Sequence, residues 1–167
     1  MAIFYHLVGF TDASAFLVVY LILSAHVLLV SNLAELAVYI SPNMEVAEIL
    51  GMVVNLITFL FAGFSPPAAS GVKWIYHINP LTYALSAASA SLFGDCPSDT
   101  SGSIGCTHMM NVLPSVPEDI TVKTYLKSNF GVKHDEIARN SLILVAFVVF
   151  FRILTLLAMR FLNFQKK

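Results

Sequence analysis

The protein has 167 residues, of which 57% are hydrophobic and only 11% are charged, and its mean hydropathy is +0.79. Soluble domains carry roughly twice that share of charged residues, so the composition indicates a membrane protein. The net charge is −1 and the basic residues are scattered until the C-terminal tail, which excludes the basic patch that nucleic-acid binding requires.

Three segments are long and apolar enough to cross a hydrocarbon core, which takes about 20 helical residues. They are residues 13–40, 46–65 and 141–162. Residues 1–10 are also apolar but too few to span, so we expect them to be the end of a further helix. The sequence therefore predicts an all-α membrane protein with three transmembrane helices and a partial N-terminal one.

A tight hairpin is expected between the first two spans. Pro42 and Asn43 stop one helix, and Glu45 suits the first turn of the next, where a carboxylate faces the positive end of the helix dipole. Lys166 and Lys167 end the chain, and basic residues favour the cytoplasmic side of a membrane. We therefore expect a cytosolic tail at 163–167, a cytosolic hairpin, and an extracellular loop at 66–140.

The extracellular loop contains a stretch of small residues between Asn79-Pro80 and Gly94. Ala84 and Ala88 form one of its small-xxx-small pairs, which let helix backbones approach closely inside a membrane. The stretch is too short to cross, so we expect a re-entrant helix near 80–93, an element that is tolerated only where protein surrounds it.

Cys96 and Cys106 are the only two cysteines. In an oxidising compartment they should form one small disulfide, whereas in the cytosol they would be two thiols or half a metal site. Because this loop is expected outside the cell, we expect the disulfide.

No catalytic or metal site is expected. The sequence lacks the phosphate-binding, dinucleotide-binding, zinc-protease and nucleophile-elbow motifs, and its five histidines never pair at i, i+4. An intramembrane enzyme using Asp12, His26 or Glu35 is disfavoured because these residues fall at different depths. His26, inside a span, is expected to contact another helix.

Charged residues inside spans are candidates for function by default. Glu35 and Arg152 are placed to pair across the helix bundle. The alternatives are that Arg152 only holds helices together and that Glu35 reaches the membrane interface, and we favour a structural role for both.

One face of the second span carries Met52, Asn55 and Phe59. Aromatic and sulfur surfaces with a single amide suit an adaptable site for apolar ligands. The alternative is that this face meets lipid or packs against another helix.

Six stretches, occurring in one order along the chain, resemble the end of the pleiotropic-drug-resistance ABC transporters of the G subfamily, in the style of oomycete, fungal and plant members. They are "SPNMEVAEILG" (41–51), "LFAGFSPP" (60–67), "KWIYHINPLTYAL" (73–85), "LFGDC" (92–96), "YLKSNFGVKHD" (125–135) and "RFLNFQKK" (160–167).

The resemblance implies the C-terminal part of the second transmembrane domain, of ABC-2 type, in an ATP-driven exporter of amphipathic and xenobiotic compounds. By position, Met52, Asn55 and Phe59 would face substrate, Phe64 would form a plug, and the extracellular loop would form an outer lid. The family usually has an Ile-Pro pair before Gly71 that is absent here, so the entry to the lid is shortened.

The resemblance also implies the partners and the location. They are the lipid bilayer of the plasma membrane, the other transmembrane domain, an amphipathic small molecule, and nucleotide-binding domains that use ATP and Mg. The chain itself would bind no cofactor and would be no enzyme alone. The alternative is a truncated or orphan membrane protein that only partners a full transporter, or a fragment without function.

Overall fold

The computed structural model describes residues 13–62, 73–94, 96, 104–109 and 120–162. Within these residues the only extended pairing is a single bridge between His108 and Thr121, and all other regular structure is helical, as the sequence predicts. The helices are α2 (Ala13–Ile40), α3 (Met44–Leu60), α4 (Lys73–Ile78), α5 (Pro80–Phe93), α6 (Val122–Phe130) and α7 (Ile137–Phe161), with 3-10 turns at Ile104–Cys106 and His134–Glu136.

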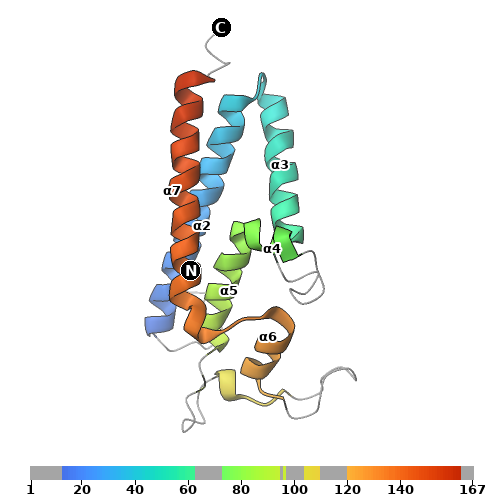
Figure 1. The fold of residues 1–167 in the computed structure, drawn as a ribbon, viewed down its shortest axis with the longest axis vertical. Coiled ribbons are helices and arrows are strands. Elements are labelled where there is room, and N and C mark those ends of the chain that lie inside the picture. The colour runs from blue at the N-terminus through green and yellow to red at the C-terminus, as the bar shows by residue number, and fades with distance from the viewer. Residues whose placement is uncertain (1–12, 63–72, 95, 97–103, 110–119, 163–167) are drawn as a thin grey trace.

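Among the residues that the structure describes, two helical segments are long and apolar enough to cross a membrane. They are Ala13–Ile40 and His134–Phe161, each of 28 residues, with mean hydropathies of 2.4 and 2.7. At 1.5 Å per residue each extends about 42 Å, beyond the roughly 30 Å of a hydrocarbon core. They run parallel, so the α2–α3 hairpin and the C-terminal end of α7 lie at the same end of the molecule (Figure 1).

The second expected span, 46–65, is shorter in the structure. Asn43 has the extended backbone of an N-cap residue (φ −135°, ψ 154°), so α3 begins at Met44, and it ends at Leu60 after 17 residues. A helix of this length extends about 25 Å and is at the lower limit of the roughly 17–25 residues that cross a hydrocarbon core. Three helical spans were expected, and α3 is shorter than predicted and is not one of the two long apolar helices of the described residues, so the third span stays a prediction.

Helix α5 packs against both α2 and α7 and completes the core (Figure 1). Its buried alanines, Ala84 and Ala87, lie against Ile22 and Leu29 of α2 and Leu144 of α7. Ala87 is fully buried. Ala88, the second member of the predicted Ala84/Ala88 pair, is partly buried against the same cluster, and small side chains of this kind suit close helix packing.

Helix α7 begins four residues earlier than expected, at Ile137 rather than Ser141. The first turn of α7 is polar, and two of its side chains make hydrogen bonds. Arg139 Nη2 donates to Glu136 Oε2 at 2.7 Å, and Asn140 Nδ2 donates to Ser86 Oγ of α5 at 3.1 Å. The loop expected at 66–140 therefore ends before this turn.

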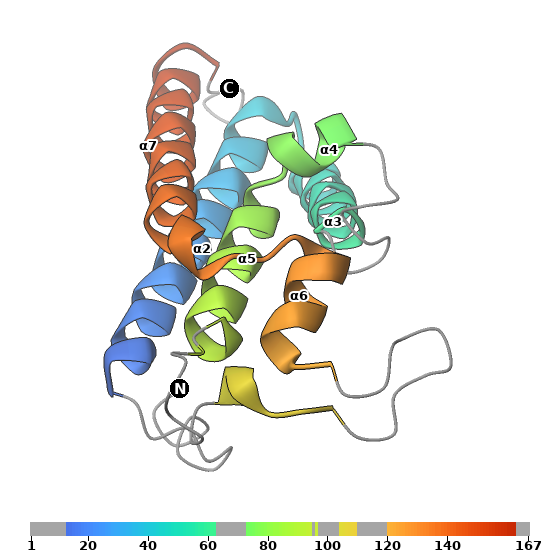
Figure 2. The same cartoon turned by 60° about the horizontal axis from the view of Figure 1, so that its bottom comes forward.

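Helix α6 and the 3-10 turn at Ile104–Cys106 lie together at the end opposite the α2–α3 hairpin (Figure 2). Thr121 Oγ1 caps α6 by accepting a bond from Thr124 N, and Gly131 ends it with φ +66°, a conformation that suits glycine. A disulfide joins Cys96 to Cys106, whose Cα atoms are 5.1 Å apart.

Loss of this disulfide is expected to destabilise the segment around α6. Closing so short a loop is worth about 3 kcal/mol in the chain-entropy account. We expect a Cys96→Ser/Cys106→Ser variant to be cut by protease near α6 faster than the parent protein. Mass spectrometry of the unreduced parent should find both cysteines bonded, and two free thiols would contradict the disulfide.

Candidate functional site

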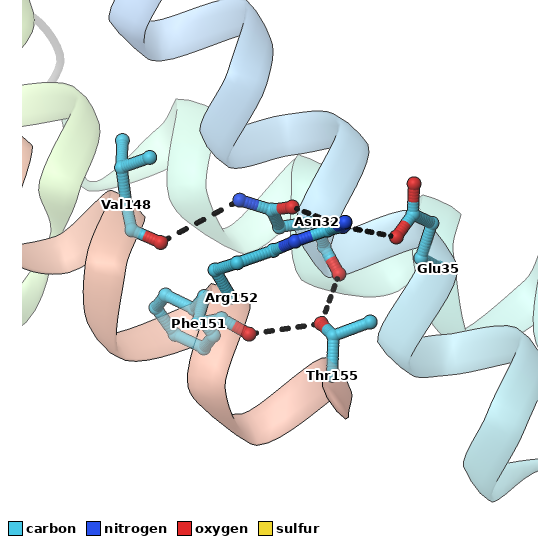
Figure 3. A network of polar contacts seen from close by, with 6 residues as sticks. All are labelled: Asn32, Glu35, Val148, Phe151, Arg152 and Thr155. Carbon is cyan, nitrogen blue, oxygen red and sulfur yellow. Dashed lines mark hydrogen bonds and ion pairs between the residues drawn. The ribbon is translucent and has the colours of Figure 1, made fainter. Parts of the chain in front are cut away.

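Four polar side chains join the otherwise apolar helices α2 and α7 (Figure 3). We call this group the polar seam, and it consists of Asn32, Glu35, Arg152 and Thr155. Arg152 Nη1 donates to Glu35 Oε2 at 2.9 Å and lies 3.4 Å from Asn32 Oδ1. The guanidinium of α7 therefore binds an acidic and an amide side chain that are about one turn apart on α2.

Asn32 and Thr155 close the seam on its buried side. Asn32 Nδ2 donates to the carbonyl of Val148 at 3.5 Å. The Thr155 hydroxyl lies 3.1 Å from the carbonyl of Asn32 and 2.8 Å from that of Phe151, so these two oxygens share its proton. Asn32 and Thr155 are both buried, and their bonds fix the register between the two helices.

The ion pair of the seam is only half enclosed by this chain. The side chains of Arg152 and Glu35 are 52% and 49% exposed. A charge in a membrane segment is costly unless it is paired, so the contact keeps both residues tolerable there. The contacts of the seam hold α2 and α7 together.

A second polar contact joins the end of α3 to the beginning of α5, and we call it the α3–α5 junction. Asn79 Nδ2 donates to the carbonyl of Thr58 at 2.6 Å, and Asn79 Oδ1 accepts from Leu81 N at 3.0 Å. Thr82 Oγ1 donates to the carbonyl of Phe61 at 3.4 Å. The last carbonyls of a helix lack hydrogen-bond partners within that helix. Here Asn79 and Thr82, at the beginning of α5, donate hydrogen bonds to two carbonyls at the end of α3.

Asn79 therefore acts twice, as the N-cap of α5 and as a donor to α3. The residue is only 7% exposed. Helices α3 and α5 run in the same direction, one following the other along the bundle (Figure 1). The junction thus links two short helices end to end.

A groove of about 330 Å³ separates α2 from α3, and we call it the α2–α3 groove. Its walls are mainly aliphatic, with polar groups from His26, Asn55 and Thr58. The lining residues are His26, Leu29, Val30, Leu33, Ala34, Leu36, Ala37 and Ile40 of α2 with Leu50, Gly51, Val54, Asn55 and Thr58 of α3.

Of the three residues expected to face substrate, one lines the α2–α3 groove and two do not. Asn55 lines the α2–α3 groove. Met52 and Phe59 do not line it and are 67% and 70% exposed on the outer face of the helix. Phe64, expected at a plug, lies outside the described residues.

His26 lines the α2–α3 groove, a position that the sequence did not indicate. A contact from His26 to another helix was expected, yet His26 Nδ1 is buried and has no hydrogen-bond partner among the described residues. The available signal was the antiparallel hairpin, which places a residue at the middle of α2 opposite the last turns of α3. In the described part of the chain, no group of three His, Cys, Asp or Glu residues gathers as a metal site.

Two candidate membrane-spanning helices, joined by an ion pair, are typical of an integral membrane protein of the α-helical class. The family model described as ABC-2 type transporter matches residues 1–93, and the model described as CDR ABC transporter matches residues 108–167. The chain therefore belongs to the ABC-2 type transporter family, as the resemblance in its sequence indicates.

Several plant proteins are similar to this chain. ABC transporter G family member 36 of Arabidopsis thaliana is 30% identical over 79% of the chain, and ABC transporter G family member 35 of the same plant is 30% identical over 99%. Pleiotropic drug resistance protein 1 of Nicotiana tabacum is 27% identical over 99% of the chain. The chain spans only 8% to 11% of the length of these relatives.

Proposed function

We propose that this chain is the permease portion of an ATP-driven exporter of amphipathic and xenobiotic compounds. The single observation that carries the proposal is the succession of the two family matches, at residues 1–93 and 108–167, along one helical chain. In this proposal the nucleotide-binding domains that use ATP and Mg belong to other parts of the transporter. The chain contributes the path through the membrane and does no chemistry itself.

The proposed membrane arrangement rests on helix lengths and on the α3–α5 junction. Helices α2 and α7 each cross the bilayer. Helix α3 is short for a crossing, so we place α3 and α5 end to end as one discontinuous crossing, in which the Asn79 side chain binds the carbonyl of Thr58 at the end of α3. Irregular backbone at membrane depth is tolerated where protein surrounds it and bonds its polar groups.

The same arrangement gives each end of the molecule a side of the membrane. The α2–α3 hairpin and the C-terminus lie in the cytosol, while α6 and the Cys96–Cys106 disulfide lie outside as part of the lid. An oxidised pair of cysteines supports this orientation because disulfides persist in oxidising compartments.

The outer face of α3 is the proposed cavity wall. Met52 and Phe59 present adaptable apolar surface there without contacts that bury them in this chain. The proposal places them against the substrate and the other transmembrane domain, with Phe64 as the plug above.

The experiment is ATP-dependent efflux from membrane vesicles of a full-length exporter carrying residues 1–167 as its last membrane segment. Met52→Ala/Phe59→Ala is expected to lower efflux of an uncharged amphipathic dye about tenfold while leaving expression unchanged, because two large apolar contacts are lost. The matched control is Leu142→Ala, an exposed residue of α7. Equal efflux in both variants would remove α3 from the cavity wall.

A further inference from the structure

A polar cavity of about 270 Å³ lies between α4, the first half of α5 and the first turn of α7, and we call it the outer cavity. Tyr76 and His77 line it from α4, Tyr83 and Ser86 line it from α5, and Asn140 lines it from α7. Its volume is close to the lower end of the roughly 300–1,000 Å³ of small-molecule sites. The fold therefore forms a space of ligand size whose lining is polar.

The outer cavity lies toward the end of the molecule that is opposite to the α2–α3 hairpin (Figure 1). Glu136, Arg139 and Asn140 line it near the beginning of the apolar segment His134–Phe161. This segment extends about 42 Å, which exceeds the hydrocarbon core by about 12 Å. If α7 crosses the membrane as proposed, its polar first turn lies in the headgroup layer, where the cavity can meet molecules of the outer solution and of the outer leaflet.

Asn140 and Ser86 leave hydrogen-bonding capacity unused at the cavity wall. Asn140 is only 3% exposed, and its Nδ2 donates to Ser86 Oγ at 3.1 Å. Asn140 Oδ1 has no partner among the described residues and yet is not sealed from solvent, so the cavity reaches this acceptor. The hydroxyl proton of Ser86 is also unused within the described residues, because Ser86 Oγ only accepts there.

Rings and further polar groups come from α4 and α5. The rings of Tyr76 and His77 meet edge to face with their centroids 5.6 Å apart, and neither side chain makes a hydrogen bond with the described residues. Tyr83 donates its hydroxyl to the carbonyl of His77 at 2.8 Å, which leaves its ring as the surface that it offers. A phenol and a neutral imidazole can each donate and accept. The lining thus combines flat ring surface with groups of both hydrogen-bonding kinds.

The charges that line the cavity balance each other. Among the described lining residues they are Glu136 and Arg139, and Arg139 Nη2 donates to Glu136 Oε2 at 2.7 Å. Glu136 Oε1 also lies 3.4 Å from Lys133 Nζ, although Lys133 does not line the cavity. A zwitterionic phospholipid headgroup would have to part the Glu136–Arg139 pair to use its charges, whereas a neutral ligand can leave the pair intact.

We propose that the outer cavity binds an uncharged sugar ring. The hydroxyl groups of a sugar donate and accept at once, which matches the free groups of Tyr76, His77 and Asn140, while the C–H face of the ring packs on Tyr83. This chemistry has two sources, a soluble saccharide and the headgroup of an outer-leaflet glycolipid. The site is separate from the outer face of α3, and only its place in the headgroup layer rests on the proposed function.

The test is photolabelling of the full-length exporter, followed by peptide mapping. The probe is dodecyl β-glucoside with a diazirine on the carbon beside the glycosidic oxygen, and it is present in both leaflets of reconstituted vesicles without ATP. We expect saturable labelling of the peptides that contain Ser86 and Asn140. Dodecyl phosphocholine with a diazirine on the same carbon should label these peptides at least tenfold less. Both probes should label the exposed face of α7 around Val149 equally.

Two variants remove the polar groups of α4 and keep the rings. Tyr76→Phe and His77→Phe are each expected to weaken saturable labelling about three- to tenfold, as loss of one hydrogen bond does, and the double variant at least tenfold. Tyr125→Phe is the matched control, because this phenol of α6 does not line the cavity. Thermal unfolding of each variant, equal to that of the parent, shows that the fold is kept.

An excess of soluble methyl β-glucoside separates the two sources of the sugar. Suppression of labelling by this competitor supports a site that takes a soluble saccharide. Saturable labelling that persists in its presence, and that still depends on Tyr76 and His77, supports a site for a glycolipid headgroup.

Three outcomes would overturn the proposal. Equal labelling by the glucoside and phosphocholine probes shows that the cavity accepts any headgroup. Unchanged labelling in the double variant shows that Tyr76 and His77 do not bind the sugar. Absence of saturable labelling at both cavity peptides in the parent shows that another part of the transporter fills the cavity. Unchanged efflux in Met52→Ala/Phe59→Ala, with cavity labelling intact, would instead contradict the proposed cavity wall and leave the sugar site in place.

Discussion

Asn79→Ala is expected to destabilise the α3–α5 junction by about 3 kcal/mol or more. The substitution leaves the carbonyl of Thr58 and the N–H of Leu81 without their side-chain partners. Each unsatisfied buried group costs about 1–3 kcal/mol, and more where no water can replace the partner. The measurement is the fraction of full-length exporter that survives graded heating in detergent, read by size-exclusion chromatography.

Two matched variants divide the effect of Asn79 into its two bonds. Asn79→Ser keeps an oxygen that can cap Leu81 but is too short to reach Thr58, so it should fall between the parent and Asn79→Ala. Thr58→Ala removes a hydroxyl and keeps the carbonyl that Asn79 binds, so its effect on the junction should be small. If Asn79→Ala is as stable as the parent protein, the two hydrogen bonds of Asn79 contribute nothing measurable to stability.

Loss of one partner of the polar seam is the second large effect expected. Arg152→Met leaves the carboxylate of Glu35 without its cation, and Glu35→Gln leaves the guanidinium without its anion. Breaking a fully buried ion pair costs about 3–5 kcal/mol. Because this pair is half exposed, we expect about 2 kcal/mol for each single variant.

The double variant Arg152→Met/Glu35→Gln tests whether the two residues act together. We expect it to lose clearly less stability than the sum of the single variants, because neither charge is then left alone. Heat survival of the four proteins gives the coupling directly. Strictly additive losses would mean that Arg152 and Glu35 are stabilised by other partners and that the seam is incidental.

Local rules predicted the helices whose ends and faces are set by their own residues. Ala13–Ile40 has the predicted bounds because a long apolar run is followed by Ser41 and Pro42. Pro80–Phe93 does as well, because Asn79 caps it and Gly94 follows it. Helix α6, which was not among the helices predicted above, is bounded by the same kind of local signal, with Thr121 before it and Gly131 after it.

Contacts between distant segments decided what the sequence did not predict. Helix α3 ends five residues before the predicted boundary, where side chains of α5 bind its last carbonyls, and hydropathy alone does not encode that meeting. The polar first turn of α7 likewise has a partner in a distant segment, because Asn140 donates to Ser86 of α5. The α2–α3 groove forms only when the two helices of the hairpin lie side by side. His26 and Asn55 both line it, although no sequence motif links these two residues.

The measurement that tests the membrane arrangement most directly is labelling of single cysteines by a maleimide that cannot cross membranes. Asn43→Cys in the hairpin and Ser128→Cys on α6 are introduced separately into a full-length exporter whose native disulfide is kept. The account predicts that Ser128→Cys reacts in intact cells and that Asn43→Cys reacts only after permeabilisation. Reaction of both from the same side would show that α3 and α5 do not cross the membrane together.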